Sequence, residues 1–186
     1  MYLSTCVLVY FPHGIIPSML VFDSHSIELK SRSPEQTRQL GMRLGGVLQT
    51  GDVLCLQGEL GAGKTTFVQG IAQGWGSLDS VSSPTFILVN VYRRTDQSRD
   101  GVTPSLLFHM DAYRLDSTGE AEELDLDSML AEGALIVEWP ERMQSLISNE
   151  RLWVEFVQSG EEERELKFNA RGKRYEALLE MIQGGK

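Results

Sequence analysis

The chain has 186 residues, of which 41% are hydrophobic and 23% are charged, a composition typical of globular domains rather than disordered or fibrous chains. The length suits a single domain. The formal net charge of -9 argues against general nucleic-acid binding, because a phosphate backbone would be repelled at long range. The two cysteines, Cys6 and Cys55, are too few for a disulfide framework, so we expect a cytoplasmic location.

Residues 1 to 27 are interpreted as an N-terminal extension of a single domain that spans residues 28 to 186. The first residues are apolar, but no basic residue precedes Lys30, and Pro12 and Pro17 interrupt the apolar run. Neither a signal peptide nor a membrane span is therefore expected. Met19 offers an alternative start.

The predicted elements alternate between helices and strands. Ser33 and Pro34 have the character of a helix start, and the helix is expected to end near Gly51. Residues 53 to 56 read as a buried parallel strand, and residues 65 to 75 as a helix. Further strands are predicted over residues 86 to 92, 106 to 110, 134 to 137, 152 to 157 and 164 to 170, with an acidic helical stretch over 117 to 132 and a closing helix over 175 to 182.

This order predicts an α/β fold of three layers, a P-loop NTPase fold with a mixed, mostly parallel central sheet. The sheet is expected to be mixed because the strands that are consecutive near Tyr92 and near Gly160 have no room for a helical crossover between them.

A glycine-rich motif follows the first buried strand. It matches G-x-x-x-x-G-K-[ST], and a strand before it and a helix after it are what a phosphate-binding loop requires. Its glycines permit the tight turn, Lys64 would reach the β- and γ-phosphates, and the Thr65 hydroxyl would reach Mg²⁺. No Asn-Lys-x-Asp guanine signature occurs, which favours ATP. The predicted nucleotide-binding residues of the loop are Gly58, Glu59, Leu60, Gly61, Ala62, Gly63, Lys64, Thr65 and Thr66.

Two acids end apolar runs, Asp111 after residues 106 to 110 and Glu138 after residues 134 to 137. The carboxyl ends of strands are where nucleotide-binding folds place metal-binding carboxylates. One acid is expected near Mg²⁺, directly or through water, and the other could orient the attacking water. His109 lies in an apolar run without a second histidine or cysteine nearby, so we expect a hydrogen-bonded core residue rather than a metal ligand.

Two groups of basic residues leave alternatives open. Arg114 could stabilise phosphate charge or pair with the acidic stretch. A C-terminal basic cluster could contact RNA or serve only solubility; it consists of Lys167, Arg171, Lys173 and Arg174.

Four segments together resemble one known family, the TsaE ATPases of bacterial tRNA threonylcarbamoyladenosine biosynthesis. They are the loop of residues 58 to 66, Ser83-Pro84-Thr85-Phe86, His109-Met110-Asp111-Ala112-Tyr113-Arg114-Leu115, and Glu138-Trp139-Pro140-Glu141. The resemblance covers about residues 28 to 170. The chain departs from it in its N-terminal extension and in a polar loop over residues 93 to 104, and neither contains a motif.

The resemblance implies Mg²⁺-dependent ATP binding and hydrolysis that support threonylcarbamoyl modification of the adenosine next to the anticodon. It also implies action through a complex of the partner proteins TsaB and TsaD, so that tRNA is met only indirectly, through that complex.

The same resemblance implies roles for individual residues. Thr65 and Glu138 would be the Mg²⁺ ligands, and Asp111 a second acid near the metal. Thr85 would sense the γ-phosphate as a switch residue, so the catalytic set is Lys64, Thr85, Asp111 and Glu138. Thr37 and Arg164 would approach the nucleotide base. Trp139 could contact a partner or pack against the P-loop.

Two other functions remain alternatives. A P-loop small-molecule kinase would need an arginine-rich lid, and none is evident in the sequence. A nucleotide-sensing module that does not hydrolyse ATP would tolerate loss of the water-orienting acid, yet both Asp111 and Glu138 are present.

Overall fold

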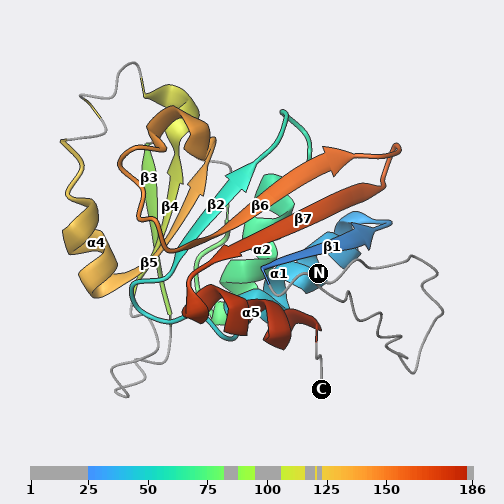
Figure 1. Cartoon of the computed structure of the whole chain (residues 1–186), viewed down its shortest axis with the longest axis horizontal. Coiled ribbons are helices and arrows are strands. Elements are labelled where there is room, and N and C mark those ends of the chain that lie inside the picture. Colours follow the sequence, from blue (N-terminus) through green and yellow to red (C-terminus); the bar gives the residue numbers. More distant parts are fainter. Residues whose placement is uncertain (1–24, 82–87, 95–105, 116–119, 121–122, 184–186) are drawn as a thin grey trace, which may run out of the picture.

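A computed structural model describes residues 25 to 81, 88 to 94, 106 to 115, 120 and 123 to 183. Seven strands form one sheet in the order β1-β7-β6-β2-β5-β4-β3, with helices packed on both sides (Figure 1). The strands are β1 (Ser26–Ser31), β2 (Val53–Gln57), β3 (Val89–Arg93), β4 (Leu106–Asp111), β5 (Gly133–Glu138), β6 (Arg151–Gln158) and β7 (Arg164–Arg171). The helices are α1 (Pro34–Gly45), α2 (Lys64–Trp75), α4 (Leu126–Glu132) and α5 (Lys173–Gln183), with the 3₁₀ turns η1 (Ala112–Arg114) and η2 (Pro140–Met143).

The sheet is mixed, as predicted. Its four central strands, β6, β2, β5 and β4, are parallel. The pairs β3–β4, β6–β7 and β1–β7 are antiparallel. The first two of these pairs are the consecutive strands whose connections are too short for a helical crossover.

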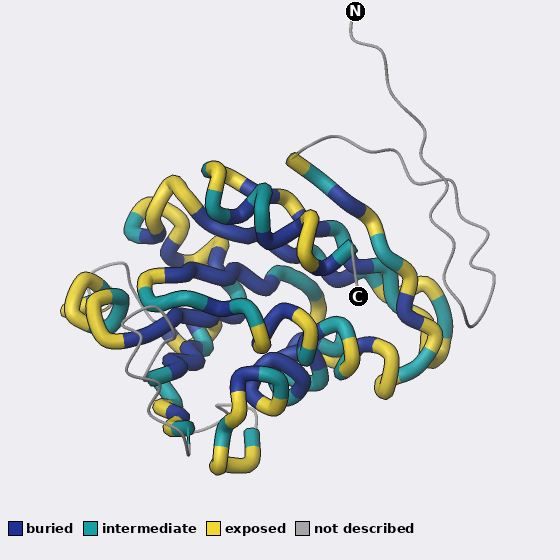
Figure 2. Tube along the Cα trace, turned by 90° about the horizontal axis from the view of Figure 1, so that it is seen from below, coloured by how far each residue is buried: buried dark blue, intermediate teal, exposed yellow. Residues whose placement is uncertain are grey.

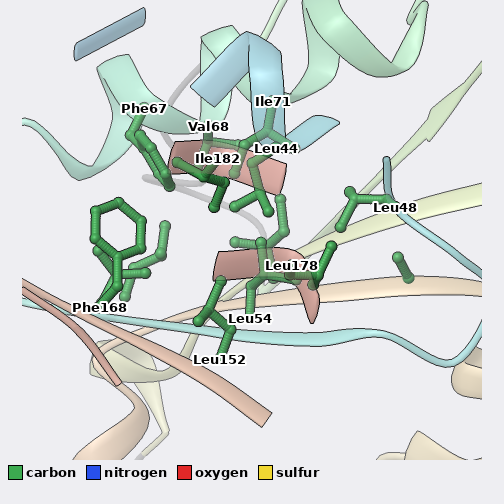
Figure 3. Close-up of a cluster of buried hydrophobic side chains, with 14 of the residues drawn as sticks. Leu44, Leu48, Leu54, Phe67, Val68, Ile71, Leu152, Phe168, Leu178 and Ile182 are labelled. Carbon is green, nitrogen blue, oxygen red and sulfur yellow. The ribbon is translucent and has the colours of Figure 1, made fainter. Parts of the chain in front are cut away.

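Each face of the sheet has its own core. On one face, α1, α2 and α5 cover a large apolar cluster; Figure 3 shows Phe67, Val68 and Ile71 of α2 facing Leu152 and Phe168 of the sheet. On the other face, α4, η1 and η2 cover strands β2, β5 and β4. Among the residues described, neither β1 nor β7 contributes to this second core. Buried positions accordingly concentrate in the strands and on the inner sides of the helices (Figure 2).

The first helix begins as its sequence predicts. The Ser33 hydroxyl accepts a hydrogen bond from the Gln36 backbone N–H at 3.3 Å, and Pro34 occupies the first turn. The Gln36 side chain in turn accepts a bond from the Arg32 backbone N–H at 2.7 Å. These contacts satisfy backbone donors that the first turn leaves free and fix the direction in which α1 leaves β1.

The structure departs from the prediction at two helices, one predicted strand and one strand that was not predicted. The helix expected to end near Gly51 ends at Gly45, where Gly46 caps it. Of the strand predicted over residues 86 to 92, residues 86 and 87 lie outside the described residues, Leu88 forms a bend, and the strand runs from Val89 to Arg93. The helix predicted over residues 117 to 132 is not continuous: Glu120 is helical, residues 123 to 125 are not, and the Asp125 side chain accepts bonds from the Ser128 N–H and hydroxyl and so caps a new helix, α4, at Leu126. Strand β1 was not predicted, although its side chains alternate between buried and exposed.

Helix α5 is attached to the start of β2 by polar contacts. The Arg174 guanidinium donates to both carboxylate oxygens of Asp52, at 2.9 and 2.7 Å, and to the Val47 carbonyl. The Val53 N–H donates to the Tyr175 hydroxyl at 2.8 Å. Arg174 therefore has a structural role that neither alternative for the basic cluster anticipated.

A helix long and apolar enough to cross a membrane does not occur in the described part of the chain.

Candidate nucleotide-binding site

The glycine-rich loop connects the end of β2 to the start of α2. Gly58 and Gly63 have φ angles of 149° and 102°, values that side-chain-bearing residues rarely adopt. A Cβ at Gly58 would also lie 2.8 Å from the Phe156 carbonyl oxygen of β6. The loop can therefore turn tightly from the end of β2 into the N-terminus of α2. Backbone N–H groups of such a loop and of a helix N-terminus are what bind phosphate in proteins.

Lys64 is buried at this point and is held by the loop itself. Its Nζ donates to the Gly58 carbonyl at 2.7 Å and to the Glu59 carbonyl at 3.0 Å. It also lies 4.3 Å from the centroid of the Trp139 ring. Burial lowers the pKa of Lys64, while the negative charges of Glu138 and Asp111 act in the opposite direction.

The structure brings together the hydroxyl and the two acids predicted for the metal. Asp111 and Glu138 are paired positions at the carboxyl ends of the parallel strands β4 and β5. The Glu138 Oε1 atom lies 3.5 Å from the Thr65 hydroxyl, and Glu138 is only 4% exposed. Burial raises the pKa of Asp111, partly opposed by a hydrogen bond from the Tyr113 backbone N–H. Positive charge on Arg114 also opposes this rise, so Arg114 acts near the site.

His109 is a hydrogen-bonded core residue, as predicted, but its partner was not foreseen. The ring is 0% exposed, and Nε2 lies 2.9 Å from Glu138 Oε1. On its other side, Nδ1 lies 3.3 Å from the Tyr92 hydroxyl. A chain of contacts thus runs from β3 through β4 to the acid at the end of β5. The only signal in the sequence is a polar residue two positions before Asp111 inside an apolar run.

Trp139 is the one non-glycine residue in the described segments with a positive φ, at 57°. Such a conformation is uncommon for a bulky residue and often marks a functional site. It follows Glu138 directly and places the indole against Lys64 and, at 5.1 Å between ring centroids, against Tyr113. Trp139 therefore packs against the P-loop, which is one of the two roles that the sequence left open for it.

Thr37 and Arg164 both lie beside the loop. A Cβ on Gly63 would be about 4 Å from each of their side chains. The Thr37 hydroxyl is 2.7 Å from that of Ser31, and the Arg164 guanidinium donates to the Ala62 and Gly61 carbonyls at 3.0 and 3.3 Å. Arg164 thus supports the loop from β7, which spacing alone could not indicate. Thr85 lies outside the described residues.

Comparison with known proteins places this geometry in a family. The family model for the threonylcarbamoyl adenosine biosynthesis protein TsaE matches residues 31 to 166. The chain belongs to the TsaE family. A TsaE protein of Bacillus subtilis is 39% identical over 157 residues, which cover 84% of this chain and 93% of that protein. A TsaE protein of Streptomyces coelicolor is 42% identical over 116 residues, 62% of this chain and 74% of that protein.

A solved structure agrees with the TsaE assignment. The crystal structure of YdiB from Bacillus subtilis superposes with a TM-score of 0.68 at 31% identity, over 90% of this chain and 97% of that one. The P-loop fold predicted from the order of the helices and strands is thereby confirmed. The resemblance noted in the sequence also holds across the matched region, which contains the loop, Asp111 and Glu138.

The protein oxygens near the phosphate-binding loop could supply part of the coordination shell of a Mg²⁺ ion. Within the described segments, no group of three His, Cys, Asp or Glu side chains is placed to hold a metal. Mg²⁺ is usually bound by one or two protein oxygens together with substrate phosphates and water. The Thr65 hydroxyl with the Glu138 carboxylate supplies such a partial set, so the residues fit a metal that arrives with a nucleotide.

Proposed function

We propose that this TsaE protein binds ATP with Mg²⁺ and hydrolyses it in the service of tRNA threonylcarbamoyladenosine formation. The observation that carries the proposal is the 3.5 Å approach of the Thr65 hydroxyl to Glu138 at the mouth of a loop that also holds Lys64. A glycine-rich turn that bound nothing would have no use for a buried lysine and a buried carboxylate at one point.

Each residue of the site has its own role in the proposed reaction. Backbone N–H groups of the loop and the Lys64 ammonium bind the phosphates, and Thr65 with Glu138 would hold the metal. Mg²⁺ supplies charge neutralisation to the phosphates when it is bound. Asp111 lies beside Glu138, and its raised pKa suits a group that orients water and takes up a proton. We propose Thr85 as the γ-phosphate sensor, and Thr37 and Arg164 as the residues next to the base.

The surroundings of the loop support action through partner proteins. Leu60 at the loop tip is 90% exposed, and Tyr113 beside Trp139 is 55% exposed. Large apolar side chains at the mouth of a polar site are suited to being covered by another protein. We propose that the partners are TsaB and TsaD, that tRNA is reached through their complex, and that the reaction takes place in the cytoplasm.

The test is ATP turnover by the purified protein, alone and with TsaB and TsaD. Lys64→Ala should lose turnover by at least about a hundredfold, because it removes the cation aimed at the terminal phosphates. The matched control is Lys167→Ala, which removes a partly exposed lysine on β7 whose ion-pair contact is Glu28 at 3.8 Å.

The outcomes separate the alternatives. Normal turnover by a folded Lys64→Ala protein would refute the assignment of the loop. Transfer of the γ-phosphate to a small molecule rather than to water would establish the kinase alternative. ATP binding that alters partner affinity while no phosphate is released, with partners present, would establish the sensing module.

A further inference from the structure

A second polar pocket lies away from the phosphate loop, on the face of β6, β7 and β1 opposite α1, α2 and α5. Its volume is about 390 Å³, and its lining includes Arg151, Trp153, Asn169, Arg171, Ser26 and Gln144. The covering elements of that face, α4, η1 and η2, pack on β2, β5 and β4 instead. Figure 1 shows α4 at the β3 to β5 side of the molecule, away from β1. The pocket therefore opens beside a part of the sheet that none of the described helices covers.

Arg151 is the central feature of this pocket. The residue is only 4% exposed, yet it forms no ion pair with any described residue. Its Nη1 atom donates to the neutral Ser148 carbonyl at 2.7 Å, and its Nε is buried without a hydrogen-bond partner. Burying a cation without a counter-charge is costly, so the site is electrostatically incomplete.

Arg171 adds a second positive charge to the same place. It is the direct cross-strand partner of Arg151 in the β6–β7 ladder. Residues directly opposite on antiparallel strands project from the same face, and like charges in such pairs are destabilising. Within the described part of the chain Arg171 also lacks an ion pair. An anion bound between the two guanidinium groups would turn this repulsion into attraction.

The neighbouring side chains hold the pocket in a fixed shape. The Arg151 guanidinium carbon lies 5.3 Å from the centroid of the Trp153 ring, and the Trp153 Nε1–H donates to Gln57 at 2.8 Å. Asn169 stands opposite Trp153 in the ladder and offers an amide to a ligand, as does Gln144.

The acidic side chains near this pocket either contact basic side chains or lie outside the pocket lining. Glu176 contacts His25 at 3.0 Å, and Glu28 contacts Lys167 at 3.8 Å. Glu155 projects from the same face two residues beyond Trp153, where its direct partner on β7 is Lys167. Glu150 precedes Arg151, but its side chain lies against Gly172 and lines a different hollow, together with Asp52 and Arg174. The potential in the pocket is therefore set mainly by the two arginines, despite the net charge of -9.

We propose that this pocket binds a phosphate group, held between Arg151 and Arg171, as a site separate from the nucleotide loop. Paired guanidinium groups match the geometry and charge of phosphate oxygens, and the volume lies in the range of small-molecule sites. The phosphate can belong to a free phosphorylated compound or to an RNA strand. Both present the same oxygens to the arginines.

The experiment is a ¹H–¹⁵N NMR titration that follows the indole N–H signals of Trp153 and Trp139. Because Trp139 lies against Lys64, its signal reports the nucleotide loop, whereas Trp153 lies against Arg151 in the second pocket. The Trp153 N–H also donates to Gln57, next to Gly58 of the loop, so its response is assigned to the second pocket only where Arg171→Gln weakens it. The probes are inorganic phosphate and a short single-stranded RNA. Arg171→Gln removes an exposed arginine and should weaken the binding seen at Trp153 by about tenfold, while the response at Trp139 stays unchanged.

The matched control is Lys167→Gln, which removes a positive charge from the same strand and face, outside the pocket lining. It should leave the Trp153 response within about twofold of the parent, as expected for loss of a solvent-screened charge. The proposal is overturned if neither probe shifts Trp153 at millimolar concentration. It is equally overturned if Arg171→Gln and Lys167→Gln weaken the response alike. A response to phosphate alone would identify a free compound, and tighter binding of RNA would identify a strand.

Discussion

At the scale of single residues, Glu138 depends on its neighbours for its position. It is a nearly fully buried acid whose polar contacts include the His109 ring at 2.9 Å and the Thr65 hydroxyl at 3.5 Å. Groups that hold a metal ligand from behind fix its orientation, and their loss typically costs about 10- to 100-fold in activity or metal affinity. His109 is accordingly a positioning residue for the proposed reaction.

We expect His109→Leu to lower ATP turnover by at least about tenfold and to raise the Mg²⁺ concentration needed for half-maximal turnover. The leucine fills the buried space but offers no hydrogen bond to Glu138. Steady-state turnover measured over a range of Mg²⁺ concentrations tests this. The Mg²⁺ dependence is the decisive readout, since simple loss of folded protein would reduce turnover without shifting it.

The matched control at this scale is Tyr92→Phe. It removes the outer hydroxyl, which lies 3.3 Å from His109 Nδ1, and leaves the contact between His109 and Glu138 in place. Its turnover should stay within a few-fold of the parent. An unchanged Mg²⁺ dependence in His109→Leu would show that Glu138 keeps its orientation without the ring.

At the scale of elements, the packing of α1 against α2 depends on glycine. A Cβ added at Gly45 would meet the Ile71 carbonyl and the Trp75 backbone N. Gly41, Gly70 and Gly74 have equally close backbone neighbours across the same interface. The two helices therefore approach backbone to backbone, and this contact sets the direction of α2, whose first turn forms part of the phosphate site.

Gly45→Ala should lower the free energy of unfolding by about 1 to 3 kcal/mol or more, because the added methyl group forces the backbones of α1 and α2 apart. Urea denaturation measures the change. Gly46→Ala is the matched control, since its Cβ would have no neighbour nearer than 3.6 Å and its φ of -67° suits alanine. It should be neutral or slightly stabilising. Equal losses in the two variants would disprove close packing at Gly45.

Elements defined by local patterns could be predicted from the sequence, and those defined by tertiary contacts could not. The cap at Ser33, the apolar run of β2 and the loop before α2 are all specified by neighbouring residues. Strand β1 has only a short alternation and is fixed by pairing with β7, far along the chain. The start of α4 depends on one side-chain cap at Asp125 within a charged run that is otherwise typical of a continuous helix.

The same distinction applies to the candidate site. The loop, Thr65 and the acids at the strand ends follow from motif and position. The contacts of His109 with Glu138 and of Arg164 with Ala62 join positions 29 and 102 residues apart. A polar residue in an apolar run signals that it needs a partner, but a single sequence does not show which distant residue that partner is. The structure is needed to show which polar residues in apolar runs belong to the site.

At the scale of the whole molecule, two groups with strongly raised pKa values, Cys55 in β2 and Tyr175 in α5, contribute to the pH dependence of stability in alkaline solution. Cys55 belongs to the core under α4, η1 and η2, and Tyr175 to the core under α5. Burial raises the pKa of each group to about 12, from ordinary values of 9.0 and 10.0. Both are neutral below their ordinary pKa, so their contribution is complete at neutral pH.

Above pH 9 the unfolded chain loses these protons first, which favours unfolding. The free energy of unfolding should therefore fall as pH rises from 9.0 toward about 12, by up to about 1.4 kcal/mol per pH unit for each group. Urea denaturation at several pH values measures the slope. Cys55→Ala should reduce the slope between pH 9.0 and 10.0, because Cys55 is the first of the two groups to lose its proton in the unfolded chain.

The Cys55→Ala variant is also expected to be less stable at neutral pH because it loses buried volume. The comparison therefore uses slopes rather than absolute values, and an identical slope in parent and variant would mean that the thiolate is as well solvated in the folded protein as in the unfolded chain.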